Sequence, residues 1–168
     1  MKDALKDLKE QGMEALVLDV RDDLGGSLSD VCDIADIFLP KNAVITTVKS
    51  RINEETVYRT HSDGLDLPIA MLVNGYSASA SELLSGALKD NGVAELFGTV
   101  TFGKDGTIKF TTDAYYTPSG VCIQGTGITP DHVVELPEGL TYYNIPSIPY
   151  ESDTQLQAAV AYLQGLDQ

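Results

Sequence analysis

The chain has 168 residues and a formal net charge of −14 at pH 7, and 43% of its residues are apolar. This length suits one domain, and the apolar content is sufficient for a core. The negative charge argues against nucleic acid and anionic membranes as partners, because phosphate binding requires clustered Lys and Arg. No apolar run is long enough for a membrane span, and the charged N-terminus is unlike a signal peptide.

The first hundred residues alternate between helical and strand patterns. We expect helices over three amphipathic segments, residues 3–11, 30–40 and 81–92. Strands are expected over the apolar or alternating segments between them, residues 14–20, 43–51, 55–60, 67–74 and 94–100. Pro40 closes the second helix, and Ser27 or Ser29 caps it. The strand at 14–20 is apolar and β-branched, as is typical of a strand buried on both faces. Strand–helix alternation predicts βαβ units and a mainly parallel sheet.

The remaining third of the chain is less regular. Residues 106–136 alternate like short strands broken by turns. Residues 136–152 contain three prolines and are expected to be extended on the surface. Residues 153–166 predict a C-terminal helix with Asp153 or Thr154 as its cap. The expected fold class is therefore α/β, with a mainly parallel sheet, flanking helices and a small additional β region.

Two apolar strands each end in a turn that opens a helix: LVLDVRDDLGGSLSD and AMLVNGYSASASELL. In a parallel sheet both turns lie at the carboxyl edge, where ligands bind in open α/β folds. Gly25 and Gly26 allow exposed backbone N–H groups, and the second turn places hydroxyls at a helix N-terminus. A serine there is a candidate nucleophile beside an oxyanion hole. A serine before a helix is, however, more often only a cap.

A serine nucleophile needs a base. His61 lies in a polar loop and His132 precedes a short strand, and the sequence shows no carboxylate to orient either, so both are expected at the surface or a strand edge. Lys104 follows an apolar strand and a glycine, so its side chain can be held inward, where burial favours the neutral amine. On spacing alone, a solvated turn lysine is the commoner arrangement.

The two cysteines, Cys32 and Cys122, are far apart and form no CxxC pair, so we expect neither a zinc site nor a redox motif. Cys32 falls on the apolar face of a predicted helix and is expected to be a small core residue. A single disulfide between the two is left open.

Several stretches together resemble the carboxyl-terminal processing peptidases, the tail-specific serine protease family S41. They occur in the family's order over most of the chain: LVLDVRDDLGG, VNGYSASASELLSGALKD, FGTVTFGK, YYTPSG, IQGTGITPD and DTQLQAAVAYL. The resemblance implies a core related to ClpP and the crotonases, a Ser–Lys dyad usually assisted by a glutamine, and no cofactor or metal. It also implies an exported enzyme that acts on unstructured C-terminal segments of proteins. Homo-oligomer formation is left open.

The resemblance assigns roles to individual residues. Ser79, the middle serine of SASAS, matches the nucleophile, and Lys104, 25 positions later, matches the general base. Ser77 and Ser81 are then cap and packing hydroxyls. The oxyanion hole is matched by the N–H groups of two residues, Gly25 and Ala80, with Gly26 supporting the turn.

The chain departs from the family pattern in several places. Ile108 stands where the family has its glutamine, and GK is followed directly by DGTIKF, as though a segment after Lys104 were deleted. The glycine turn reads DDLGG instead of NNPGG, so a proline is lost and Asp22 and Asp23 add negative charge. The family's N-terminal helical region with its first core strand, and its PDZ domain, are not recognisable. We therefore expect one trimmed catalytic core over residues 1–168, with weak or absent peptidase activity.

Two alternatives are weighed against a peptidase. The first is an inactive or engineered scaffold of the same fold, which binds an extended peptide along a strand edge or binds none. The second is a crotonase-like acyl-CoA enzyme, which is disfavoured because no basic patch is available for CoA phosphates.

Overall fold

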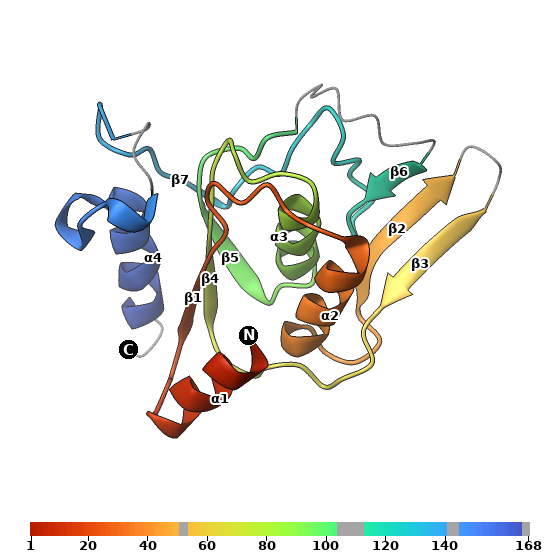
Figure 1. Cartoon of the computed structure of the whole chain (residues 1–168), viewed down its shortest axis with the longest axis horizontal. Helices are drawn as coiled ribbons and strands as arrows, with labels where there is room; N and C mark the ends of the chain where they lie inside the picture. The colour runs from red at the N-terminus through yellow and green to blue at the C-terminus, as the bar shows by residue number, and fades with distance from the viewer. Residues whose placement is uncertain (51–53, 104–112, 141–144, 166–168) are drawn as a thin grey trace.

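The computed structural model describes residues 1–50, 54–103, 113–140 and 145–165. These residues form two sheets (Figure 1). The parallel sheet has the order β1-β4-β5-β7, formed by Leu16–Asp19, Ile69–Val73, Ala94–Gly98 and His132–Val133. The antiparallel sheet has the order β3-β2-β6, formed by Glu55–Arg59, Val44–Ser50 and Asp113–Tyr116. The predicted α/β class, with a mainly parallel sheet and a small additional β region, is confirmed.

The helices divide between the two faces of the parallel sheet. The α-helices of the described residues are α1 (Lys2–Glu10), α2 (Leu28–Phe38), α3 (Ala80–Asp90) and α4 (Thr154–Gly165). In Figure 1, α4 covers one face, α2 and α3 cover the other, and the antiparallel sheet lies beyond these two helices. None of the helices in the described ranges is long and apolar enough to cross a membrane.

Strand β4 separates two cores because its side chains alternate between the two faces. Ile69, Met71 and Val73 belong to the core beneath α2 and α3. Ala70 and Leu72 belong to the core beneath α4. Each of these five residues is at most 2% exposed, and burying a side chain such as Leu72 contributes about 1.5–3 kcal/mol. A continuous apolar run is what a strand covered on both faces requires.

Strand β1 differs from its prediction. We expected a strand buried on both faces, but Leu16, Val17 and Leu18 are only partly buried and Asp19 is exposed. Among the described residues β1 pairs only with β4, so it is an edge strand. An apolar run reports that the faces are covered, but it carries no information about whether a neighbouring strand lies on each side.

The helix caps decide between the alternatives that the sequence left open. Ser27 rather than Ser29 caps α2, because its Oγ accepts a backbone N–H of the first turn at 3.1 Å. Asp153 rather than Thr154 caps α4, because its carboxylate accepts the Leu156 N–H at 3.0 Å. Helix α3 begins one residue earlier than predicted, at the residue after Ser79.

The segment before α4 is also more structured than predicted. Its described part, expected to be extended, contains two short 3-10 helices, η1 (Ile145–Ser147) and η2 (Tyr150–Ser152). Both lie where prolines occur, and the fixed φ of proline suits a 3-10 turn as well as an extended segment.

Both cysteines are free thiols, so no disulfide forms between them. Cys32 packs partly buried against the larger core, as predicted. Burial, together with the charge of Asp33, raises the pKa of the Cys32 thiol. The thiol is therefore held in its neutral form at pH 7 and behaves as a small core residue.

Both histidines are exposed, as predicted. His132 begins β7, and its Nε2 lies 3.3 Å from Glu95 Oε2 on the neighbouring strand. The ring stacks on Phe97 with centroids 4.3 Å apart. The sequence did not reveal the Glu95 carboxylate because the two residues are 37 positions apart and meet only through strand pairing.

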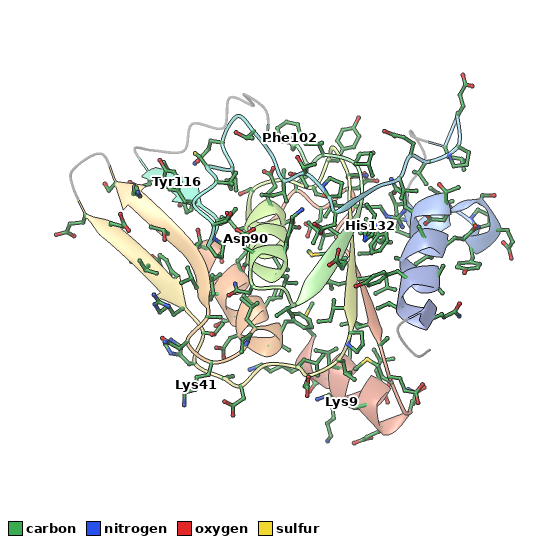
Figure 2. The ribbon with its side chains drawn as sticks, turned by 180° about the vertical axis from the view of Figure 1, so that it is seen from behind. Lys9, Lys41, Asp90, Phe102, Tyr116 and His132 are labelled. Carbon is green, nitrogen blue, oxygen red and sulfur yellow. The ribbon has the colours of Figure 1, made fainter. Side chains whose placement is uncertain are left out.

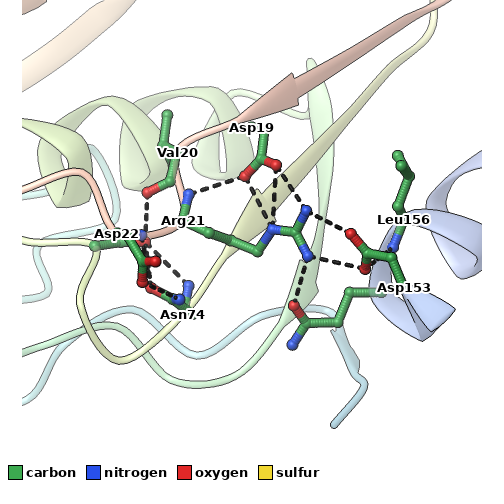
Figure 3. A network of polar contacts seen from close by, with 9 residues as sticks. Asp19, Val20, Arg21, Asp22, Asn74, Asp153 and Leu156 are labelled. Carbon is green, nitrogen blue, oxygen red and sulfur yellow. Dashed lines mark hydrogen bonds and ion pairs between the residues drawn. The ribbon is translucent and has the colours of Figure 1, made fainter. Parts of the chain in front are cut away.

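A buried guanidinium attaches the C-terminal helix to the end of β1 (Figure 3). Arg21 is 8% exposed and Asp153 is 2% exposed. The two terminal nitrogens of Arg21 donate to the two carboxylate oxygens of Asp153 at 2.9 and 2.8 Å. Asp19 accepts from Arg21 at 2.7 Å, and Gln155 Oε1 accepts at 3.0 Å. A buried ion pair is tolerated only when its donors are matched in this way.

We predict that Asp153→Ala lowers the free energy of unfolding by about 1.5–3 kcal/mol, because the buried Arg21 would lose its charge-assisted hydrogen bonds to Asp153 while it keeps those to Asp19. Denaturation with urea at pH 7 measures the change. Glu10→Ala is the matched control, since the carboxylate of Glu10 forms an exposed ion pair with Lys6 at 3.9 Å. Loss of this exposed ion pair should lower the free energy of unfolding by less than about 1 kcal/mol.

The stabilising effect of Asp153 should depend on pH. Burial alone would raise the pKa of Asp153, but hydrogen bonds from Arg21 and from the Leu156 N–H hold it below its ordinary value of 3.8. The stabilising contribution is therefore complete above pH 3.8 and is lost as the pH falls further. The difference in stability between the wild type and Asp153→Ala should shrink in this acid range. A difference that stays constant throughout the acid range would contradict the assignment.

Candidate active site

Three loops meet at the carboxyl edge of the parallel sheet. They follow β1, β4 and β5, which are adjacent and parallel, so that their carboxyl ends share one edge. Figure 1 shows these loops together at the top of the view. Phe102, in the loop after β5, lies at the same end of the molecule in Figure 2.

Ser77 connects all three loops. It is fully buried, its Oγ donates to the Val20 carbonyl at 2.7 Å and it accepts the Asn74 N–H at 3.0 Å. Its carbonyl accepts the N–H of Phe102 at 3.0 Å. Ser77 is therefore a structural residue that holds the turn after β4 between the loops after β1 and β5. Its hydroxyl does not cap a helix.

Asn74 and Asp22 form a second connection between the loops after β4 and β1 (Figure 3). The Asn74 side chain accepts the Asp22 N–H at 3.0 Å and donates to the Asp22 carboxylate at 2.8 Å. The same amide oxygen accepts the Tyr76 N–H at 3.0 Å. Asp22 has a positive φ of 58°, so this pair also holds a strained residue in place.

Gly25 packs directly against the turn after β4. It has a φ of +84°, and a Cβ at this position would lie 2.6 Å from both the Ala78 carbonyl oxygen and the Ala80 nitrogen. The Ala78 N–H donates to the Asp23 carbonyl at 2.9 Å, which fixes the distance between the two loops. Only glycine fits this position, because both the backbone conformation and the space exclude a side chain.

Ser79 lies in a strained strand-to-helix turn. It is the N-cap of α3, and its φ and ψ are 54° and −114°, values that a non-glycine residue rarely adopts. Such strain costs about 1–3 kcal/mol and occurs mostly at functional sites. Sharp strand-to-helix turns of this kind present the nucleophilic serine of α/β-hydrolases. Ser79 is partly exposed, and among the described residues the adjacent Ala80 N–H has no hydrogen-bond acceptor.

Glu82 holds this turn from one side. The side chain is buried, with 4% of its surface exposed. Its Oε2 accepts the Ser79 N–H at 2.9 Å, while its Oε1 accepts from Thr101 Oγ1 at 2.7 Å and from the Gly103 N–H at 2.9 Å. The carboxylate therefore connects the N-terminus of α3 to the loop after β5.

Thr101 and Gly103 extend the same network to the following segment. Thr101 Oγ1 also accepts the Ile128 N–H at 2.7 Å, while its own N–H donates to the Ile128 carbonyl at 3.1 Å. A Cβ on Gly103 would lie 2.0 Å from the Gly127 nitrogen. The chain is thus closely held up to Gly103, the residue before Lys104.

The structure therefore brings part of the predicted site together. Ser79, Ala80 and Gly25 meet at one edge, and Gly26 follows Gly25 in the same exposed turn. The Gly25 N–H donates to Asp23 Oδ1 at 3.0 Å. Lys104, the predicted base, and Ile108, the predicted replacement for the family glutamine, lie outside the described residues.

Sequence reasoning missed Glu82, Asn74 and the structural role of Ser77. The signal for Glu82 was present, because Ser79-x-x-Glu82 has the spacing of a capping box. No sequence pattern marked Asn74 or Ser77, since their partners Asp22 and Val20 are more than fifty positions away.

A small cavity lies beside this site, and a larger one lies far from it. A cavity of about 140 Å³ lies beside the turn after β4, lined by residues that include Tyr76, Leu136 and Ile145. A cavity of about 630 Å³ lies between α1 and residues 62–65. Because residues 62–65 precede β4, this larger cavity is at the opposite, amino edge of the sheet.

Comparison with known proteins identifies the family. Residues 1–134 match the model of peptidase family S41. The carboxyl-terminal-processing protease of Synechocystis sp. is 39% identical over 173 residues, which cover 96% of this chain and 40% of that protein. The carboxy-terminal-processing protease of Bartonella bacilliformis is 38% identical, over 86% of this chain and 37% of that protein. The chain belongs to peptidase family S41, a family of serine hydrolases.

Solved structures agree with this assignment. The photosystem II D1 C-terminal processing protease superposes with a TM-score of 0.70 and 30% identity, over 80% of this chain and 38% of that chain. A putative S41 protease from Bacteroides fragilis superposes with a TM-score of 0.74 at 20% identity, over 98% of this chain and 49% of that one, and shows the likeness of fold alone. The chain spans about two fifths of the length of the curated relatives named above.

We predict that Ser77→Ala lowers the free energy of unfolding by about 1–3 kcal/mol, because the partly buried Asn74 N–H loses its partner and the Val20 carbonyl keeps only the Asp23 N–H at 3.3 Å. Ser85→Ala is the control: Ser85 is equally buried, but its hydroxyl donates only to the Ser81 carbonyl within α3 at 2.7 Å. Its loss should cost less, since alanine favours helix. Thermal unfolding measures both variants, and equal effects would contradict the connecting role of Ser77.

Proposed function

We propose that this chain is the catalytic region of a serine endopeptidase of the C-terminal processing type. Ser79 is the nucleophile, Lys104 is the general base, and the substrates are unstructured C-terminal segments of proteins. The observation that carries the proposal is the strained N-cap conformation of Ser79 beside the free Ala80 N–H. Membership of family S41 supports it.

The proposed reaction is acyl transfer in two steps. Ser79 Oγ attacks the scissile carbonyl carbon while the neutral amine of Lys104 accepts the hydroxyl proton. The carbonyl oxygen becomes an oxyanion that accepts hydrogen bonds from the N–H groups of Ala80 and Gly25. The intermediate collapses as the proton passes to the leaving amine, which leaves an ester on Ser79. Water then hydrolyses this ester by the same steps, with Lys104 again accepting the proton.

The start of α3 favours the charge that develops in this reaction. The first N–H groups of a helix have no partner within the helix, and the helix dipole adds positive potential at its N-terminus. The Ala80 N–H is the first of these groups in α3. Because Glu82 accepts the Ser79 N–H, the carboxylate orients the nucleophile and leaves the Ala80 donor available.

Exposed apolar side chains around the site support a peptide substrate. Leu24 is 71% exposed, Tyr76 is 54% exposed and Val100 is 44% exposed, one on each of the three loops. An extended chain that crosses these loops would cover all three side chains. The cavity of about 140 Å³ beside Tyr76 has room for a small substrate side chain, so we expect this site to prefer small or apolar residues.

The inactive scaffold of the same fold is the second candidate function. The observation that favours it is the hydrogen bond from the Gly25 N–H to Asp23, which occupies one proposed oxyanion donor. A fluorophosphonate probe separates the two, because it labels an activated serine and leaves a passive hydroxyl unmodified. Labelling at Ser79 supports the peptidase, and it is read beside peptide cleavage because Ser–Lys enzymes can resist such probes.

We predict slow cleavage of an unstructured peptide with an apolar C-terminus, and its complete loss in Ser79→Ala. Liquid chromatography with mass spectrometry measures the products and the cleaved bond. Ser81→Ala is the matched control, since Ser81 is two residues away on the same turn and should retain the activity. Cleavage that persists in Ser79→Ala, or that Ser81→Ala abolishes, would contradict the assignment.

We predict that Glu82→Gln lowers kcat by on the order of 10²-fold, the cost of misplacing reacting groups by about 1 Å. Glutamine offers one acceptor oxygen where three donors, from Ser79, Thr101 and Gly103, require acceptors. Glu95→Gln is the control, since Glu95 lies on β5 and contacts His132 instead. A Glu82→Gln enzyme with unchanged kcat and normal circular dichroism would refute the positioning role.

A further inference from the structure

We propose that Asp23 restrains the oxyanion hole of this chain. Its carboxylate holds the Gly25 N–H and must give it up before that group can bind the carbonyl oxygen of a substrate. Asp23 is thus a positioning residue that inhibits the reaction. Removal of its negative charge by substitution should activate the enzyme. This inference rests on the proposed function of Ser79.

The contact is built into the loop after β1. Asp23 Oδ1 accepts the Gly25 N–H at 3.0 Å, and the Asp23 carbonyl accepts the Ala78 N–H at 2.9 Å. The backbone of Asp23 is therefore fixed against the turn that carries Ser79. Its side chain accepts the N–H of Gly25, a residue so close to the next turn that a Cβ on it would lie 2.6 Å from the Ala80 nitrogen. The held N–H and the free N–H of Ala80 consequently belong to neighbouring parts of one site.

Competition follows from the chemistry of one N–H group. Such a group donates one good hydrogen bond, and a bond to a carboxylate is roughly twice as strong as one to a neutral acceptor. In the transition state the substrate oxygen carries negative charge and approaches the same hydrogen as Asp23. Two negatively charged oxygens would then share one donor. Asp23 opposes the reaction most strongly where the oxyanion forms. It therefore lowers kcat more than it weakens substrate binding.

No neighbouring cation in the described residues draws the Asp23 carboxylate away from the Gly25 N–H. Asp23 forms no ion pair within the described ranges. Arg21, two residues earlier, directs its guanidinium to Asp19 and Asp153 (Figure 3). Asp30, in the first turn of α2, is also exposed and carries the same charge, but its carboxylate does not accept the Gly25 N–H. Asp30 is therefore the matched control for a general effect of charge.

The kinetic test compares Asp23→Asn with Asp30→Asn on one unstructured peptide. Loss of one oxyanion donor typically costs 10²–10³ in kcat, so weakening the hold of residue 23 on the Gly25 N–H should raise kcat at least about tenfold. Asp30→Asn should change kcat less than about twofold. A peptide boronic acid, which forms a tetrahedral adduct on serine, should bind Asp23→Asn more tightly by a similar factor, while a product peptide should bind both variants equally.

A second measurement follows the hydrogen bond itself. The amide proton of Gly25 should move upfield in the NMR spectrum of Asp23→Asn and stay in place in Asp30→Asn, because a charge-assisted bond to Gly25 is lost only in the first. Asp23→Ser, which is neutral and keeps a short acceptor, replaces Asp23→Asn if the latter does not fold. An unchanged Gly25 resonance in the neutral variant would overturn the inference.

The outcomes separate this inference from the function on which it rests. Ser79-dependent cleavage with an Asp23→Asn kcat at least tenfold higher supports both. Ser79-dependent cleavage with equal kcat in wild type and Asp23→Asn, or with equal gains in both asparagine variants, overturns the inference and leaves the function standing. Cleavage by neither protein, or cleavage that survives Ser79→Ala, overturns both.

Discussion

The buried carboxylate of Glu82 is the interaction on which the candidate site depends. It accepts three hydrogen bonds, from Ser79, Thr101 and Gly103, and so joins the N-terminus of α3 to the loop after β5. Hydrogen bonds to a charged group contribute about 1.5–3 kcal/mol each. Three such bonds exceed the strain of about 1–3 kcal/mol that a residue such as Ser79 stores in its backbone. The strained conformation can therefore persist.

The remaining connections position the loop after β1, which carries Gly25, beside the turn that carries Ser79. Ser77 and Asn74 bind the loop after β1 to the turn that carries Ser79, and Gly25 approaches that turn more closely than any other residue type could. Further away, Arg21 and Asp153 attach α4 to the end of β1. The hydrogen bonds of Ser77 to Val20 and of Arg21 to Asp153 are buried, so each stabilises only as long as its partner remains. A site built in this way is rigid, which acyl transfer requires.

Much of this arrangement could be predicted from the sequence. The apolar run of β4 and the amphipathic pattern of α3 depend on local periodicity, and both elements were located to within two residues. The resemblance to family S41 singled out Ser79 from Ser77 and Ser81. Local pattern could not reveal that β1 is an edge strand, because strand neighbours are decided by distant segments. It also could not show that Asp23 holds Gly25, since the same letters fit a solvated turn.

If Ser79 is the nucleophile, peptide cleavage passes through an acyl-enzyme on its hydroxyl, and this intermediate can be trapped. The chain is incubated with an activated peptide ester, quenched in acid and digested, and the modified residue is located by mass spectrometry. We expect one acyl group, on Ser79, which disappears over time as water hydrolyses the ester. An acyl group on Ser77 or Ser81, or no modification of the turn after β4, would contradict it.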